Sequence, residues 1–294
     1  MLPSNIKKLR EVFDRDGFVV VPDLLNEEEL ERYGRATDEA VARRQRRDHR
    51  LLADKSLYEQ SFIQCMNLWE DSPAVLPLTF HPRIGQVAAA LIGAKALRLW
   101  HDQALYKEPG GRMTDPHQDQ PYWPIKETDN LTAWIPFDGS TVASGAMGYL
   151  PGSHRLGVAK FVNIFSAEKV GEPLSDPAFR DIQPVFVEVP RRAAAFHHGL
   201  TMHLAKPNLS ERVRRVHTMI YFRDGSTRGS AFPHFAVERA RIQLGEPIDS
   251  DVTPIAWPRP QGDWPKPSLK FPWGEIPLKF ASSGIVPRAP LKPD

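Results

Sequence analysis

A histidine and an aspartate two positions apart, His117 and Asp119, lie in the stretch DPHQDQPYW, between prolines and just before two aromatic residues. A His-x-Asp pair alone is weak evidence, because a chain with ten histidines can contain one by chance and because such a stretch can be a simple turn. If the pair flanks a bend at the end of a strand, residues i and i+2 point to the same side and can reach one metal ion.

A second stretch far downstream strengthens the metal interpretation. FHHGLTMHLAKPNLSERVRRVHTMIYF places His203 on an expected strand, whereas the adjacent His197 and His198 would alternate faces, so at most one of these two points inward. Two histidines and one carboxylate on one face of iron(II) leave three positions open, which suits oxygenases that bind both a cosubstrate and dioxygen. We therefore expect His117, Asp119 and His203 to be metal ligands and to form the catalytic centre.

Arg214 is a candidate for binding an anionic ligand. It lies eleven positions after His203 (214 − 203) and heads the expected strand RRVHTMIYF, where it shares a face mainly with apolar residues. If 2-oxoglutarate chelates iron through its keto acid end, its far carboxylate needs a fixed cation, and a guanidinium gives a bidentate match. The alternative is that Arg214 belongs to a solvated edge beside Arg212 and Arg215.

The rest of the chain must supply the elements that position these residues. The first hundred residues are mainly helical in pattern, with candidate N-caps at Asn5 and Asn26 and a short apolar strand, FVVVP, between them. From Leu97, short segments rich in aromatic and branched residues alternate with Pro and Gly, which predicts an antiparallel sandwich or barrel. From Thr253 the chain is rich in Pro and Trp, so we expect this extension to lack regular structure. Its large aromatic residues indicate that it packs on the barrel or on a second subunit.

Composition and charge restrict the class of protein. A formal net charge of +2 and a hydrophobic content of 41% are typical of a globular protein with a large core and give no indication of nucleic-acid binding. We interpret the basic run from Arg43 to Arg50 as a solvated helix face rather than a phosphate site. The lone Cys65 excludes an intramolecular disulfide framework, and no stretch approaches the ~20 apolar residues of a membrane span, so we expect a cytoplasmic protein.

The sequence resembles the phytanoyl-CoA dioxygenase family of iron(II)- and 2-oxoglutarate-dependent oxygenases. The resemblance covers most of the chain and rests on FDRDGFVVVPDLLNEEELERY, HDQALYKEPGG, HQDQPYW, ASGAMGYLPGSHR and HHGLTMHLAKPN followed by Arg214. It implies a mainly β fold with flanking helices around a double-stranded β-helix (jelly-roll, cupin-like) core. It also implies a single oxygenase domain over residues 1–294, with a helical portion at about 1–95, a barrel at about 96–225 and the Pro/Trp-rich extension at about 250–294.

Carried over by position, the family's metal ligands and cosubstrate arginine fall on His117, Asp119, His203 and Arg214. Gln103, in HDQALYK, and Trp134, in LTAWIPF, resemble residues that line the family's cosubstrate and iron pocket, although each could be an ordinary barrel residue. The family often has a serine two positions after the distal histidine, able to hydrogen-bond the cosubstrate carboxylate, and here that position is Ala205. Another group, such as Thr218 or a water molecule, would have to take over that bond.

The implied function is that of an iron(II)- and 2-oxoglutarate-dependent dioxygenase, which uses O2 to hydroxylate or otherwise oxidise a small molecule and releases succinate and CO2. Two alternatives keep the same barrel: a cupin-type metal-dependent isomerase or hydrolase without 2-oxoglutarate, and a non-catalytic binding protein. Arg214 favours the oxygenase, because an enzyme that needs only a metal has no use for a buried guanidinium. The intact set of two histidines and one carboxylate argues against a binding protein.

Aromatic residues beside the ligand pair indicate the kind of substrate. Tyr122 and Trp123, with Trp134, would place aromatic surface at the mouth of the barrel, which favours an apolar or mixed-polarity small molecule over a free sugar or a nucleic acid. The alternative is that these rings fill the core between the barrel and the helices. No nucleic-acid or membrane partner is expected, and the C-terminal extension could form a homodimer contact.

Overall fold

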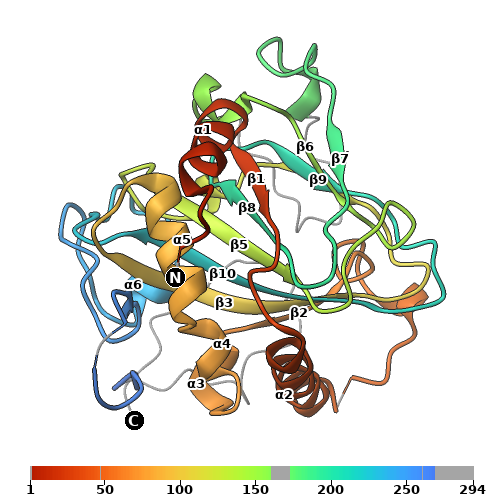
Figure 1. Ribbon diagram of the computed structural model, residues 1–294, viewed down its shortest axis with the longest axis horizontal. Helices are drawn as coiled ribbons and strands as arrows, with labels where there is room; N and C mark the ends of the chain where they lie inside the picture. The colour runs from red at the N-terminus through yellow and green to blue at the C-terminus, as the bar shows by residue number, and fades with distance from the viewer. Residues whose placement is uncertain (1, 47, 160–172, 260, 269–294) are drawn as a thin grey trace.

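Two antiparallel β-sheets lie at the centre of the molecule, and helices pack on the outer face of the larger sheet (Figure 1). The computed structural model describes residues 2–46, 48–159, 173–259 and 261–268. The larger sheet has the strand order β1-β8-β5-β10-β3-β11, with β2 also paired to β3, and the smaller sheet has the order β4-β9-β6-β7. The predicted mainly β fold with a jelly-roll core and flanking helices is confirmed.

The bounds of the elements follow the chain from the helical part into the sheets. The larger sheet contains β1 (Phe18–Val21), β2 (Ile63–Met66), β3 (Leu97–Lys107), β5 (Asn130–Pro136), β8 (Ala194–His198), β10 (Arg214–Arg223) and β11 (Ile255–Trp257). The smaller sheet contains β4 (Thr114–His117), β6 (Met147–Tyr149), β7 (Val185–Val187) and β9 (His203–Ala205). The α-helices are α1 (Ile6–Asp16), α2 (Glu27–Gln45), α3 (Leu68–Asp71), α4 (Leu76–Thr79), α5 (Pro82–Ile92) and α6 (Phe235–Glu238). Short 3-10 helices span Leu52–Asp54, Gln120–Tyr122, Ser153–Leu156 and Pro173–Ser175. Each helix that the structure describes is too short or too polar to cross a lipid bilayer.

Local sequence signals account for the two long helices at the N-terminus. Asn26 caps α2 through a reciprocal pair of hydrogen bonds with Glu29, in which each side chain accepts from the other residue's backbone N–H at 2.8 and 2.9 Å. Asn5 also lies at the N-cap position of α1, but its side chain makes no capping hydrogen bond. Gly17 ends α1 with a left-handed φ of 82°, and the chain passes directly into β1.

Successive side chains of each strand point to opposite faces of the larger sheet. On β5, Leu131, Ala133 and Ile135 pack into a core with α1, α2 and α5, while Trp134 points to the opposite face. That opposite face meets the smaller sheet in a second apolar cluster formed by side chains from both sheets, among them Trp134, Met147, Tyr149, Ala205 and Val216. The inner faces of β3, β5, β8 and β10 therefore line the space between the sheets.

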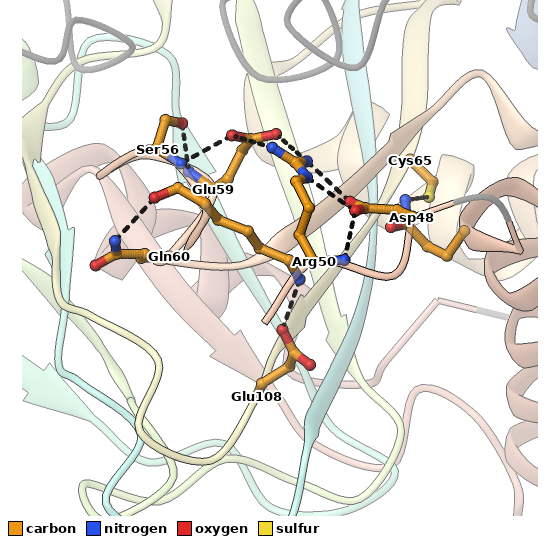
Figure 2. Close-up of polar contacts among 9 residues, drawn as sticks. Asp48, Arg50, Ser56, Glu59, Gln60, Cys65 and Glu108 are labelled. Carbon is orange, nitrogen blue, oxygen red and sulfur yellow. Dashed lines mark hydrogen bonds and ion pairs between the residues drawn. The ribbon is translucent and has the colours of Figure 1, made fainter. Parts of the chain in front are cut away.

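The segment between α2 and β2 is held by ion pairs that include part of the basic run (Figure 2). Arg50 lies between Asp48 and Glu59, with nitrogen–oxygen distances of 2.8 and 2.7 Å. On α2, Arg44 pairs with Asp71 at 2.8 Å. Arg44 and Arg50 are therefore paired with acidic residues of the same chain. The run was interpreted as one solvated helix face, but α2 ends at Gln45, so Arg50 lies beyond the helix.

The C-terminal extension differs from its prediction. It was expected to lack regular structure after Thr253, yet Ile255 and Trp257 form the short strand β11 on the edge of the larger sheet, paired with β3. Proline is tolerated at the ends of an edge strand, because its missing N–H is not needed by a further strand there. Trp257 and Trp264 pack against the core of α1, α5 and the larger sheet, so this part of the extension covers its own chain. Residues 269–294 lie outside the described residues, and the possible homodimer contact through this extension stays a prediction.

Candidate metal centre

The three predicted metal ligands converge between the two sheets. His117 ends β4 and is paired in register with His203, the first residue of β9, while Asp119 lies just beyond the end of β4. Each residue offers one ligand atom, and these atoms lie within 4.8 Å of one another. Oδ1 of Asp119 is 3.8 Å from Nε2 of His117 and 3.7 Å from Nε2 of His203. Ligand atoms that share a first-row metal at about 2.0–2.2 Å lie at most about 4.4 Å apart, so these distances leave room for one ion.

Both histidines present a free lone pair to this space. Nδ1 of His117 lies 2.8 Å from the carbonyl oxygen of Asp115, and Nδ1 of His203 lies 2.9 Å from that of Thr201. Because a carbonyl oxygen only accepts, each Nδ1 carries the proton and each Nε2 is left as a ligand atom. Burial lowers the pKa of both imidazoles, which keeps them in the neutral form that binds a metal. Two neutral imidazoles and one carboxylate are a donor set that fits iron(II).

Asp119 completes the set as an ionised carboxylate with its second oxygen occupied. Burial alone would raise its pKa, but the hydrogen bond from His197 favours the ionised form, and the pKa of this carboxyl lies well below its ordinary value. Oδ2 accepts a hydrogen bond of 2.9 Å from the hydroxyl of Thr132 and lies 3.3 Å from Nε2 of His197. The negative charge needed to balance a cation is therefore present.

His197 was not predicted as a member of the site. The alternation argument allowed one of His197 and His198 to point inward, and the inward residue is His197, which is 2% exposed. His198 points to the other side of β8, where its ring lies 6.3 Å from that of Phe13. The sequence could not choose between them, because the choice depends on the register of β8 with β1 and β5.

Arg214 is buried on the inner face of β10, and the solvated-edge alternative is wrong. It is 4% exposed, its guanidinium lies 5.2 Å from the ring centre of Trp134, and Nη1 donates to the carbonyl of Gly145 at 2.5 Å. Its neighbours are different: Arg212 is exposed, and Arg215 pairs with acidic residues on the outer face. Among the described residues no carboxylate pairs with Arg214, and its buried Nε has no hydrogen-bond partner. Burial without an anion lowers the pKa of Arg214 to about 10.

The other predicted cosubstrate residues share the face of Arg214. Thr218 on β10 is paired across the strands with Gln103 on β3 and with Trp134 on β5. The amide oxygen of Gln103 accepts a hydrogen bond from Gln64 at 2.6 Å. The hydroxyl of Thr218 is buried and has no partner among the residues that the structure describes. Two buried polar atoms without a partner, this hydroxyl and Nε of Arg214, therefore occur on one strand face.

The two aromatic residues predicted to line the substrate site, Tyr122 and Trp123, lie in different environments. The ring of Tyr122, in the 3-10 helix after Asp119, is partly exposed and lies 6.3 Å from that of His117. Trp123 is 8% exposed and packs in a core cluster with Phe222, Val237 and other apolar side chains. Its placement corresponds to the core-filling alternative, because the backbone turns at the end of the 3-10 helix and directs the next side chain inward.

Similarity to known proteins decides the family. The family model for phytanoyl-CoA dioxygenase (PhyH) matches residues 13–216. The chain belongs to this family. The phytanoyl-CoA dioxygenase domain-containing protein 1 homolog of Caenorhabditis briggsae is 23% identical to it over 72% of this chain and 88% of that protein. Among solved structures, the non-heme alpha ketoglutarate dependent carbocyclase SnoK from nogalamycin biosynthesis is 26% identical, with a TM-score of 0.71 over 85% of this chain and 95% of that one. The epimerase SnoN in complex with Fe3+, alpha ketoglutarate and nogalamycin RO is 24% identical, with a TM-score of 0.69 over 86% and 99% of the two chains.

Phytanoyl-CoA dioxygenase family members are non-haem iron, 2-oxoglutarate-dependent oxygenases, and this chain is an enzyme of that class. The enzyme class and the cofactors predicted from the sequence are confirmed. Family membership decides against the metal-dependent isomerase or hydrolase and against the non-catalytic binding protein. A carbocyclase and an epimerase share the fold, so the fold alone does not determine which oxidation this phytanoyl-CoA dioxygenase family member performs.

Proposed function

We propose that this oxygenase holds iron through His117, Asp119 and His203, binds the far carboxylate of 2-oxoglutarate at Arg214, and oxidises an apolar or mixed-polarity small molecule. When bound, iron and 2-oxoglutarate supply the oxidising chemistry with O2 and release succinate and CO2. The observation that carries the proposal is the buried Arg214 without an anion, on a sheet face that also lines the metal site. A cation out of water without a counter-ion is costly, and a ligand carboxylate would offset that cost.

The geometry of Arg214 suits a carboxylate. The carbonyl of Gly145 occupies Nη1, while the buried Nε has no hydrogen-bond partner within the described ranges. Two parallel N–H groups on one edge of a guanidinium match the two oxygens of a carboxylate. Trp134, Val216 and Ala205 exclude water around this end of the site, so an ion pair formed here is screened less than one at the surface.

Thr218 is proposed to replace the family's serine at the cosubstrate carboxylate. Its orphaned hydroxyl lies on the same strand face as Arg214, and Ala205 has no hydrogen-bonding side chain to offer. The isosteric change Thr218→Val is expected to raise the KM for 2-oxoglutarate roughly tenfold, because a hydrogen bond to a charged group contributes about 1.5–3 kcal/mol. The measurement is the initial rate of succinate formation at varied 2-oxoglutarate.

A matched control exists on the outer face. Thr37 of α2 is also fully buried with an orphaned hydroxyl, so Thr37→Val makes the same chemical change far from the inner face, and an unchanged KM is expected. Adding Ala205→Ser to the Thr218→Val variant should restore part of the lost affinity. An unaltered KM in Thr218→Val would show that this hydroxyl does not contact the cosubstrate.

The surroundings of Asp119 support the substrate class. Tyr58 and His101 lie close to Asp119, and neither carries a charge at neutral pH, while the ring of Tyr122 lies beside that of His117. Burial raises the pKa of the Tyr58 hydroxyl and lowers the pKa of His101 to about 4. The ring of Phe235 lies 5.8 Å from that of His101. A neutral, aromatic wall with a few hydrogen-bonding atoms favours a substrate that is apolar or of mixed polarity.

Succinate release in the presence of candidate substrates tests the function. Lipophilic acids, their CoA esters and polycyclic aromatic scaffolds are expected to stimulate succinate formation above the rate without substrate, whereas free sugars and nucleotides are not. Tyr122→Ala is expected to weaken this stimulation and to leave the KM for 2-oxoglutarate unchanged. Stimulation by highly polar compounds alone would contradict the substrate class, and an absence of 2-oxoglutarate consumption under every condition would contradict the proposed use of the site.

A further inference from the structure

A buried chain of polar side chains lies behind the carboxylate of Asp119. Nε2 of His197 is 3.3 Å from Oδ2 of Asp119, and Nδ1 of the same ring is 3.3 Å from the hydroxyl of Tyr149. Tyr149 is fully buried and His197 is 2% exposed. Neither residue is among the predicted ligands or cosubstrate contacts, so the function described above leaves both unexplained.

The partners of His197 determine where its proton lies. An ionised carboxylate only accepts, so Nε2 of His197 must carry the proton and donate it to Asp119. In the neutral imidazole Nδ1 is then an acceptor, and the hydroxyl of Tyr149 donates to it. Burial raises the pKa of Tyr149, which keeps this hydroxyl protonated at neutral pH. The three side chains therefore form a directed relay, Tyr149 to His197 to Asp119, with one tautomer of the imidazole.

Strand pairing holds each member of the relay in place. Tyr149 of β6 is paired with His203 of β9, which is itself one of the ligands. His197 of β8 is paired with Thr132 of β5 and with Phe18 of β1. The ring of Phe18 stacks on that of Tyr149 at 4.5 Å and restricts its rotation. Thr132 donates to the same Oδ2 at 2.9 Å, so both donors to this oxygen come from the larger sheet.

We propose that Tyr149 and His197 are positioning residues that keep Asp119 a one-oxygen ligand, an inference that rests on the metal site proposed above. With Oδ2 held by His197 and Thr132, only Oδ1 faces the two ligand histidines. Three protein atoms on a six-coordinate ion leave three positions, enough for a chelating keto acid and O2. A carboxylate that bound through both oxygens would take one of these positions.

His197 is not itself a candidate ligand in this arrangement. Its Nε2 uses its proton to bond Asp119 and has no lone pair to offer, while its Nδ1 faces Tyr149. The group of potential ligand atoms within the described ranges contains His117, Asp119 and His203. Partners behind metal ligands of this kind fix ligand orientation, and their loss typically reduces metal affinity 10–100-fold.

Cobalt(II) binding to the full chain, followed by its visible absorption, tests the inference without turnover. His197→Phe fills the space of the ring but removes both hydrogen bonds, and it is expected to weaken cobalt(II) affinity roughly 10–100-fold and to change the position and intensity of the absorption bands. His197→Gln keeps a donor near the position of Nε2 and should stay close to the unaltered protein. Tyr149→Phe, which keeps the core volume, should move the spectrum in the same direction as His197→Phe by a smaller amount.

His198→Phe is the control, because it makes the same change on the opposite face of β8 and should leave the cobalt(II) spectrum unchanged. Wild-type affinity and spectrum in both His197→Phe and Tyr149→Phe would overturn the inference, as would a His197→Gln variant that behaves like His197→Phe. If His197→Phe does not fold, as judged by thermal unfolding, the test rests on His197→Gln and Tyr149→Phe. A cobalt(II) spectrum that changes in Tyr149→Phe and stays close to the unaltered protein in His197→Gln would then support the inference. Cobalt(II) binding that His203→Ala does not weaken would instead contradict the metal site itself, and the relay with it.

Discussion

Replacing His203 with alanine is expected to abolish the weak visible charge-transfer band that the unaltered protein gives with iron(II) and 2-oxoglutarate in the absence of air. The change removes one of three ligand atoms that lie within 4.8 Å of one another. Succinate formation should fall to the level measured without protein. A chelator that removes iron from the unaltered protein should reproduce this loss, and added iron(II) should reverse it.

An exposed histidine provides the control for this experiment. His49 lies outside both sheets and is exposed, so His49→Ala should keep the band and the rate of succinate formation. Anaerobic absorption spectra of the three proteins at equal concentration make the comparison. If the unaltered protein shows no band with saturating iron(II) and 2-oxoglutarate, or if His203→Ala keeps it, the assignment of the metal ligands is wrong.

His117 and Asp119 could be predicted from the sequence because they are close together in the chain. The spacing of His117 and Asp119 puts both residues at the end of one short strand, where a bend directs their side chains to the same space. His203 comes from a distant part of the chain, and it was predicted from its place on an expected strand and from the resemblance to the family. The antiparallel register of β4 and β9 that joins His117 to His203 is a long-range feature that residue types do not encode directly.

Residues whose role depends on register could not be assigned from the sequence. His197 and His198 have the same chemistry and adjacent positions, and only the pairing of β8 with β1 and β5 decides that His197 faces Asp119. Trp123 follows a 3-10 helix whose end directs the ring into the core. Strand β11 lies between Pro254 and Pro258, a context that predicts irregular chain, and it forms because β3 offers a free edge.

Burial distinguishes Arg214, which the sequence predicted as the anion-binding arginine, from its neighbours Arg212 and Arg215. Arg214 and Arg215 are neighbours on β10, and strand alternation sends the first between the sheets and the second outward to Asp38 and Asp138. The outer arginine neutralises acidic residues of its own chain, whereas the inner one has no anion among the described residues. This difference makes the cosubstrate assignment testable by comparing single substitutions along one short segment.

Arg214→Ala is expected to raise the KM for 2-oxoglutarate by roughly 10–150-fold, because it removes a charge-assisted contact of about 1.5–3 kcal/mol, and to change the KM for the oxidised substrate much less. Arg214→Lys should recover part of the affinity, since an ammonium supplies the charge without the two parallel N–H groups. The measurement is the rate of succinate formation with one reactant varied and the other saturating. Arg212→Ala, at an exposed position, and Arg215→Ala, on the outer face, are the controls and should leave both constants nearly unchanged.

Thermal unfolding separates a binding role of Arg214 from a structural one. In the unaltered protein 2-oxoglutarate should raise the melting temperature, because a ligand that binds only the folded state stabilises it, and Arg214→Ala should lose this shift. The ligand-free variant should melt no lower than the unaltered protein, since a buried cation without an anion costs free energy that alanine does not. A marked loss of stability without ligand, together with equal increases in both KM values, would mean that Arg214 supports the barrel through Gly145 and Trp134 rather than binding the cosubstrate.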